Sequence, residues 1–301
     1  MIGMPGNSSE FTALSQEEEQ LSQRLREHVG ALAASERNVW RPGSLEAAAR
    51  YIETNLSAVG YEIHEQVFAA RDDRVKNIEV VIPGESGKIV VIGAHYDSVF
   101  GSPGANDNAS GVAVLIELAR EFRQEKPAHA LRFVAFVNEE MPFFASGEMG
   151  SQHYAARSRQ RGEKIAAMIS LETIGYYSDL AGSQRYPAPL SLFYPAQGNF
   201  IGFVGNIASR SLVRRAIKTF RETTHFPSEG AALPEWIPGV SWSDHASFWR
   251  NDYLALMVTD TAPYRYPHYH TPQDTSDKLD YSRMARVVSG LRKVIADFSR
   301  S

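Results

Sequence analysis

Five side chains that can bind metal ions lie where the sequence predicts strand ends and loops. They are His95, Asp107, Glu140, Glu172 and His270. Nitrogen and carboxylate ligands of this kind suit zinc and similar divalent ions, and five of them fit a site for two ions. Glu139 adds a further acid beside Glu140. Two adjacent carboxylates can divide the work, because one can bind metal while its neighbour takes a proton from water.

Each of these residues, taken singly, also has a structural explanation. His95 could simply pack at a strand end, and Asp107 could cap the helix that follows it. The acids at Glu139 and Glu172 could lie on solvated turns, and His270 could be a surface histidine with His268 competing for its role. The combination favours a metal centre, because chance acidic turns do not usually line up in this way. Asp97 fits the same interpretation, since a carboxylate two residues after His95 can accept a hydrogen bond from a metal-bound imidazole.

Composition and charge limit the remaining function classes. The 301 residues contain no cysteine, which excludes disulfides, cysteine-ligated zinc and a thiol nucleophile. The formal net charge of -4 argues against nucleic-acid binding. No apolar run approaches the roughly 20 residues that span a bilayer, so no membrane partner is expected. Residues 1–20 lack the apolar core of a signal peptide. The sequence is compatible with a cytoplasmic protein and with a secreted or periplasmic protein whose leader has been removed. It does not determine the oligomeric state.

Apolar periodicity predicts helices and strands that alternate along most of the chain. Helical spacing of apolar residues predicts helices over 21–32, 45–56, 110–124 and 284–298. Apolar or alternating runs predict strands over 61–68, 77–82, 88–92, 131–137, 165–171 and 253–258. We therefore expect an α/β fold, a single-domain three-layer sandwich with a central, mixed, mostly parallel twisted sheet between helices.

The domain is expected to cover residues 1–301, with about 1–15 disordered. Two segments rich in proline, glycine and aromatic residues, 176–198 and 225–243, are expected to be loops bordering the site. Five aromatic residues from these and other segments could line an apolar pocket for the first side chain of a substrate, or could instead belong to the core. They are Phe143, Phe144, Trp236, Trp242 and Phe248.

The set of motifs resembles the di-zinc aminopeptidases of metallopeptidase family 28, which include bacterial leucyl aminopeptidases. The matching motifs follow one another over nearly the whole chain. They are His95-x-Asp97, Asp107 in Asn-Asp-Asn-Ala-Ser-Gly, Glu139-Glu140, Glu172 and Tyr269-His270-Thr271. The resemblance implies a zinc-peptidase fold of the phosphorylase/hydrolase-like type.

The same resemblance implies a role for each residue. Asp107 would bridge two zinc ions, one completed by His95 and Glu172 and the other by Glu140 and His270. Glu139 would be the general base, Asp97 the hydrogen-bond partner of the His95 nitrogen that does not bind metal, and Tyr269 a stabiliser of the tetrahedral intermediate. The Asp107–Asn108 peptide bond would be cis. Glu172 is a departure, because many relatives have aspartate at this position.

A further segment, Ser243-Asp244-His245, resembles one that recurs in the family. We expect Ser243 and Asp244 to support the His270 side of the centre without binding metal themselves. A serine hydrolase built on this segment is disfavoured, since no Gly-x-Ser-x-Gly motif accompanies it.

The expected function is a zinc-dependent aminopeptidase that acts on peptides with a free N-terminus. Its expected cofactors are two zinc ions, although the ligands could also accept cobalt or manganese. Hydrophobic or varied first residues are the expected substrates. A single-zinc glutaminyl cyclase, a related carboxypeptidase and a non-catalytic binding module on the same fold remain as alternatives.

Overall fold

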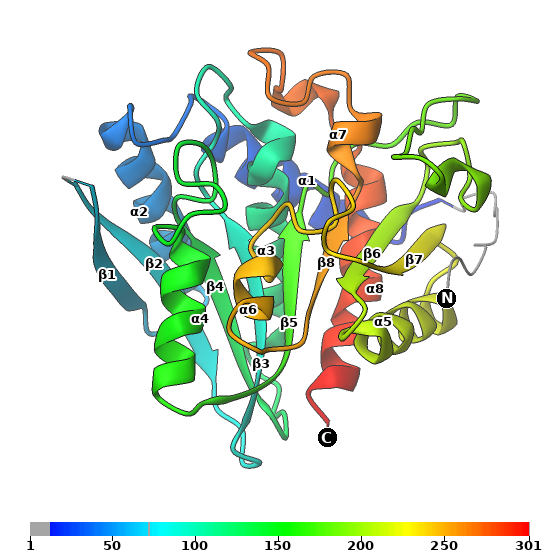
Figure 1. Cartoon of the computed structure of the whole chain (residues 1–301). Helices are drawn as coiled ribbons and strands as arrows, with labels where there is room; N and C mark the ends of the chain where they lie inside the picture. The colour runs from blue at the N-terminus through cyan, green and yellow to red at the C-terminus, as the bar shows by residue number, and fades with distance from the viewer. Residues whose placement is uncertain (1–12, 72, 301) are drawn as a thin grey trace.

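An eight-stranded sheet lies between two layers of helices in the computed structural model, which describes residues 13–71 and 73–300 (Figure 1). The strands are β1 (His64–Ala70), β2 (Asp73–Ile82), β3 (Lys88–His95), β4 (Ala130–Phe136), β5 (Lys164–Glu172), β6 (Ile201–Asn206), β7 (Ser228–Leu233) and β8 (Ala255–Thr259). They follow the order β1-β2-β4-β3-β5-β8-β6-β7 across the sheet. Four neighbouring pairs are parallel (β4/β3, β3/β5, β5/β8 and β6/β7), while β1/β2, β2/β4 and β8/β6 are antiparallel. The expected mixed and mostly parallel sheet is confirmed.

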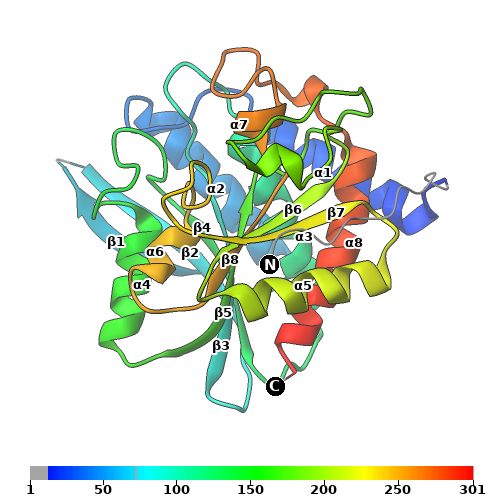
Figure 2. The same ribbon diagram turned by 45° about the vertical axis from the view of Figure 1, so that its right-hand side comes forward.

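Helices cover both faces of this sheet and enclose two apolar cores. The α-helices are α1 (Gln16–Leu32), α2 (Pro42–Ala58), α3 (Gly111–Phe122), α4 (Gly150–Gln160), α5 (Arg210–Thr223), α6 (His245–Trp249), α7 (Ala262–Arg265) and α8 (Tyr281–Phe298). Apolar stripes of α1, α2, α3, α5 and α8 share the larger core. α4 and α6 lie on the other face of the sheet (Figure 2), and their apolar residues belong to the smaller core. None of the helices among the described residues is both long and apolar enough to cross a membrane.

The structure corrects one expectation and adds elements that the sequence analysis did not predict. Segment 225–243 is not wholly a loop, because it contains β7 at the edge of the sheet. β6, α4 and α5 were also not predicted. The expectation of disorder over residues 1–15 falls mostly outside the described residues. Ser15, which is described, caps α1 through hydrogen bonds shared with Glu18.

The carboxyl ends of the central parallel strands meet at one edge of the sheet. His95 ends β3 and Glu172 ends β5, and the two strands are direct neighbours. Ligand sites of open α/β sheets lie outside this edge. The six-residue turn Ala105–Ser110 brings Asp107 to the same place, just before α3 begins. The fold thus gathers residues from distant parts of the chain above β3 and β5.

Candidate metal centre

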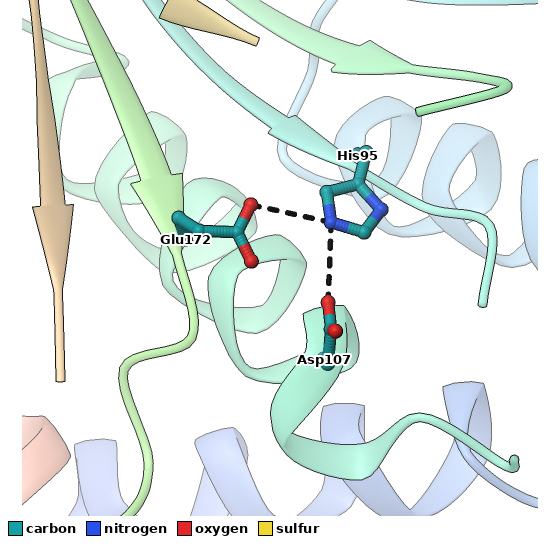
Figure 3. A group of neighbouring side chains, drawn as sticks. All are labelled: His95, Asp107 and Glu172. Atoms are coloured by element: carbon teal, nitrogen blue, oxygen red, sulfur yellow. Dashed lines mark ion pairs between the residues drawn. The ribbon is translucent and has the colours of Figure 1, made fainter. Parts of the chain in front are cut away.

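His95, Asp107 and Glu172 face one another at this edge (Figure 3). His95 Nε2 lies 3.3 Å from a carboxylate oxygen of Asp107 and 3.3 Å from one of Glu172. These separations exceed the usual N–H···O range of 2.7–3.2 Å. They match the edge of a tetrahedron around an ion with bonds of about 2.0–2.1 Å, which is about 3.3–3.4 Å. His95 Nε2 and Asp107 Oδ1 are buried and have no hydrogen-bond partner among the described residues. The three side chains therefore fit a metal ion.

Asp107, Glu140 and His270 form a second group that shares the Asp107 carboxylate. One ligand atom from each of these residues lies within 4.8 Å of the others. His270 Nε2 is 2.9 Å from Asp107 Oδ2 and 3.5 Å from Glu140 Oε1. Glu140 Oε1 is buried without a hydrogen-bond partner among the described residues. His268, the competing histidine, is in neither group and instead has its ring 5.5 Å from that of Tyr266.

The loop that carries Asp107 is held by Asp274, a residue without a predicted role. The Asp274 carboxylate accepts hydrogen bonds from the backbone N–H groups of Asn106 at 2.8 Å and Asp107 at 3.1 Å. It also accepts one from the Tyr266 hydroxyl at 3.0 Å. The Asp107–Asn108 peptide bond is cis, as the resemblance implied. Asp274 lies four residues after His270, and this proximity is the signal by which the sequence could have revealed it.

Asp97 contacts both His95 and the backbone of the paired acids. Its carboxylate lies 3.5 Å from His95 Nδ1, which is also 3.2 Å from the Asp97 carbonyl oxygen. The same carboxylate accepts hydrogen bonds from the N–H groups of Glu139 at 3.1 Å and Glu140 at 3.0 Å. Asp97 therefore ties the end of β3 to the turn that carries the two glutamates.

Ser243 and Asp244 lie on the Glu172 side, not on the His270 side as the sequence suggested. The Ser243 hydroxyl donates a 2.7 Å hydrogen bond to Glu172 and lies 3.0 Å from the Ser170 hydroxyl. Asp244 is fully buried, and this burial is the main reason that its pKa rises to about 7. The difference from expectation arises because α6 packs against β5, so the segment before α6 reaches Glu172.

Three residues in or next to the cluster have a left-handed backbone although none is glycine. They are Asn138 with φ of 61°, Thr173 with φ of 50° and His270 with φ of 58°. Such conformations cost of order 1–3 kcal/mol and are concentrated at functional sites. Hydrogen bonds hold Thr173 in place, since its N–H donates to Asn108 Oδ1 at 3.0 Å and its hydroxyl lies 3.0 Å from that of Thr259.

Crowded carboxylates give the cluster an excess of negative charge. Burial, reinforced by neighbouring carboxylates, raises the pKa of Glu139 and Glu140 well above the usual value. Burial acts to lower the pKa of His95, but Glu172, Glu139 and Asp107 outweigh it and hold that pKa well above normal. A cluster that raises carboxyl and imidazole pKa values in this way attracts protons or other cations.

Tyr269 lies between the cluster and a deep cavity. Its ring stacks on that of His270, with centroids 3.8 Å apart. Burial and the nearby carboxylates raise the pKa of its hydroxyl well above normal, so the hydroxyl stays a hydrogen-bond donor at neutral pH.

The cavity has about 820 Å³ of empty space, including its open mouth. Glu172 and Tyr269 line it on the cluster side. β6, β7 and β8 line its floor, and residues of 184–194 and 238–242 line its walls. Of the five aromatic residues considered for a pocket, only Trp242 is among the lining residues. Phe248 belongs to the smaller core and Trp236 is 80% exposed.

Two relatives are similar to most of this chain. The chain is 41% identical over 257 residues to Uncharacterized protein YfbL of Escherichia coli (strain K12), covering 82% of this chain and 79% of that protein. It is 30% identical over 222 residues to Leucine aminopeptidase 1 of Arthroderma otae, covering 69% of this chain. The chain spans about half of that fungal protein, with 54% of its length covered.

Solved structures share the fold at low sequence identity. The aminopeptidase from Aneurinibacillus sp. strain AM-1 superposes with a TM-score of 0.71 at 18% identity, covering 94% of this chain and 96% of that one. A glutaminyl cyclase from Bacteroides thetaiotaomicron gives 0.69 at 19% identity, covering 92% and 97%. A Zn-dependent exopeptidase from Parabacteroides distasonis gives 0.68 at 17% identity, covering 92% and 98%.

A match to a protein-family model identifies the family of this chain. A family model described as Peptidase family M28 matches residues 77–295, which include the whole candidate metal centre. The suspected resemblance is confirmed, and the chain is a peptide hydrolase by family. It is a member of peptidase family M28.

Proposed function

We propose that the protein is an aminopeptidase whose centre holds two divalent ions, most simply zinc. The observation that carries the proposal is the pair of three-residue groups that share Asp107. His95 and Glu172 would complete one ion site, and Glu140 and His270 the other. Bound ions of this kind polarise a carbonyl oxygen and make water a nucleophile near neutral pH.

Glu139 is suited to be the general base. It lies outside both ligand groups, yet its carboxylate is 3.8 Å from His95 Nε2 and thus borders the first ion site. It is 5% exposed, and burial raises its pKa, which favours taking up a proton. Glu139 takes a proton from the attacking water as the water oxygen bonds to the peptide carbonyl carbon. It then delivers that proton to the leaving amine as the C–N bond breaks.

The Tyr269 hydroxyl would stabilise the negative charge that develops on the carbonyl oxygen. It stays protonated near neutral pH and stacks on His270, which fixes its ring beside the cluster. A donor held in this way stabilises negative charge that develops in the transition state.

The cavity favours an aminopeptidase over a carboxypeptidase. A carboxypeptidase usually binds the terminal carboxylate of its substrate through a cationic side chain, because hydrogen bonds between opposite charges are the strong ones. Among the described residues that line the cavity there is no lysine, arginine or histidine, and the acids Glu172 and Glu229 are present. This lining suits an apolar first side chain, while the substrate amino group would lie near the carboxylates of the cluster.

A glutaminyl cyclase is the second candidate, because a cyclase shares the fold with a similar TM-score. The presence of both His95 and Glu172 beside Asp107 argues for a second ion, which a single-zinc cyclase does not use.

Metal content and hydrolysis of aminoacyl-nitroanilides distinguish the two candidates. We expect near two zinc ions per chain, with hydrolysis that is lost on chelation and restored by zinc. One zinc ion with no aminopeptidase activity and with cyclisation of N-terminal glutamine would support the cyclase instead. Binding of neither metal nor substrate would point to a non-catalytic protein.

A further inference from the structure

Arg37 is a buried arginine behind the candidate metal centre, in the connection between α1 and α2. It is 1% exposed. Its guanidinium donates hydrogen bonds to four backbone carbonyl oxygens. These are the carbonyls of Leu32 at 3.3 Å, Tyr96 at 2.7 Å, Pro103 and Gly104 at 2.8 Å. Three of the four acceptors lie in the loop that leads from His95 to the Asp107 turn.

The charge of Arg37 has no direct carboxylate partner. Among the described residues, every hydrogen-bond acceptor of its guanidinium is a backbone carbonyl and none is a carboxylate, whereas buried charges are usually paired. Burial lowers its pKa to about 10, and the nearby acids Asp274, Asp97 and Asp107 act to raise it. Arg37 therefore stays charged near neutral pH, and all the hydrogen bonds of its guanidinium go to backbone carbonyls.

These hydrogen bonds hold both ends of one loop, residues 96–104. Tyr96 directly follows His95, so its carbonyl fixes the start of the loop. Gly104 fixes the end, since its carbonyl also accepts a 3.1 Å hydrogen bond from Ala109 in the Asp107 turn. Gly104 has φ of +62°, and a Cβ there would lie 2.2 Å from the Asp107 carbonyl oxygen. The two backbones thus pack too closely for an ordinary side chain.

The backbone of Arg37 is tied to the same loop. Its N–H donates to the Ser98 hydroxyl at 3.1 Å, and the Ser98 N–H donates to the Arg37 carbonyl at 2.9 Å. The Ser98 hydroxyl in turn donates to the Ser102 carbonyl at 2.9 Å. Arg37 lies outside residues 77–295, the part matched by the family model.

We propose that Arg37 is a positioning residue that fixes His95 relative to Asp107 and thereby sets the zinc affinity of the site. The proposal rests on the proposed function, in which these two residues hold metal. Arg37 touches neither ligand side chain and acts only through the loop between them. Outer residues that orient metal ligands typically change metal affinity by about 10–100-fold when they are replaced.

Arg37→Lys is the informative variant, because it keeps the positive charge but cannot donate in four directions. Arg265→Lys is a matched control. Arg265 is also a buried arginine, 7% exposed, whose pKa burial lowers to about 10. It donates to Gln184 at 2.7 Å and to the Phe200 carbonyl at 2.8 Å, far along the chain from the 96–104 loop.

The experiment measures zinc dissociation constants of the full chain by competition with a chromophoric chelator, together with melting temperatures. We expect Arg37→Lys to weaken zinc binding about 10–100-fold. Its kcat should recover at saturating zinc, because every ligand is intact. Arg265→Lys should keep the wild-type zinc affinity within about threefold, even at a similar loss of melting temperature.

Two results would overturn the proposal. One is a folded Arg37→Lys protein that binds zinc within about threefold of wild type, and the other is an equal loss of affinity in the Arg265→Lys control. If Arg37→Lys fails to fold, Ser98→Ala removes one tether of the same loop and should weaken zinc binding about fivefold, while unchanged affinity counts against the proposal. A wild-type chain that binds no zinc would instead refute the proposed function.

Discussion

The depth of the cavity depends on Gly202 in its floor. Glu172, Thr259, Gly202 and Glu229 are successive register partners across β5, β8, β6 and β7. Neighbouring strands lie about 4.8 Å apart, so this row extends about 14 Å from the metal centre towards the sheet edge. Gly202 has no side chain to fill the space above the row. A first side chain of a substrate that enters past Glu172 would therefore pass over Gly202.

Valine at this position should shorten the cavity without breaking the sheet. The nearest atom to a Cβ built on Gly202 is the Thr259 carbonyl oxygen, at 3.3 Å, so only a small adjustment is needed. Valine also suits strands. Full burial of a leucine or phenylalanine side chain is worth about 1.5–3 kcal/mol. Blocking that burial should lower kcat/KM about 10–150-fold for substrates whose first residue is leucine or phenylalanine, since 1.4 kcal/mol is about tenfold.

The assay compares kcat/KM for alanyl-, leucyl- and phenylalanyl-nitroanilides in wild type, Gly202→Ala and Gly202→Val. Alanine as the first residue is too short to reach the floor, so its kcat/KM should stay within about twofold. Gly202→Ala should lower the leucine-to-alanine ratio only about fourfold, corresponding to about 0.8 kcal/mol for one methyl group. Melting temperature and zinc content serve as controls. An unchanged leucine-to-alanine ratio in a folded, zinc-loaded Gly202→Val protein would refute the assignment of the cavity to the first side chain.

Two further predictions test the metal centre, and a third tests the buried contact of Glu117 in α3 with α1. Glu139→Gln should lower kcat about 10²–10⁴-fold while zinc content stays at the wild-type level, and full activity would remove Glu139 from the mechanism. Removal of metal with a chelator should lower the melting temperature as well as abolish hydrolysis, because the buried carboxylates then repel one another; calorimetry with and without zinc measures this. Glu117 is fully buried, and its hydrogen bonds from His28 and Arg24 outweigh burial and lower its pKa from 4.5 to about 2. It should therefore add about 3 kcal/mol above pH 4.5 that is lost as pH falls towards 2, so denaturation curves of wild type and Glu117→Gln should differ at pH 7 and converge at low pH.

Much of the metal centre could be predicted because its residues follow strongly apolar strands. β3 and β5 are almost entirely buried, so their sequences mark strand ends, and His95 and Glu172 lie at those ends. Parallel neighbours bring such ends together, and sequence order alone then suggests which residues meet. His270 was separable from His268 only through the family motif, because both lie on the same irregular loop.

The strands under the cavity could not be predicted for a physical reason. β6 and β7 contain Gly202, Gly205 and Gly230. A side chain at Gly205 or Gly230 would clash with α5, and a side chain at Gly202 would fill part of the cavity. A Cβ on Gly230 would lie 2.9 Å from Ile217 of α5, and one on Gly205 would lie 2.6 Å from Val213. Small residues serve the close packing of α5 on one face and the open cavity on the other. The same choice removes the β-branched, alternating pattern by which strands are predicted.

The contacts of Arg37 show a different limit of sequence reasoning. Its four acceptors are backbone carbonyls, and every residue carries a backbone carbonyl, so no residue type at the accepting positions marks the interaction. Asp274 likewise binds backbone N–H groups of the Asp107 turn, and its position four residues after His270 is the one sequence signal of this role. The ligands of the centre can be read from side-chain chemistry, whereas the groups that hold the ligands act on the main chain. The contacts that support a metal site can therefore be established only once the fold has brought the main chain into place.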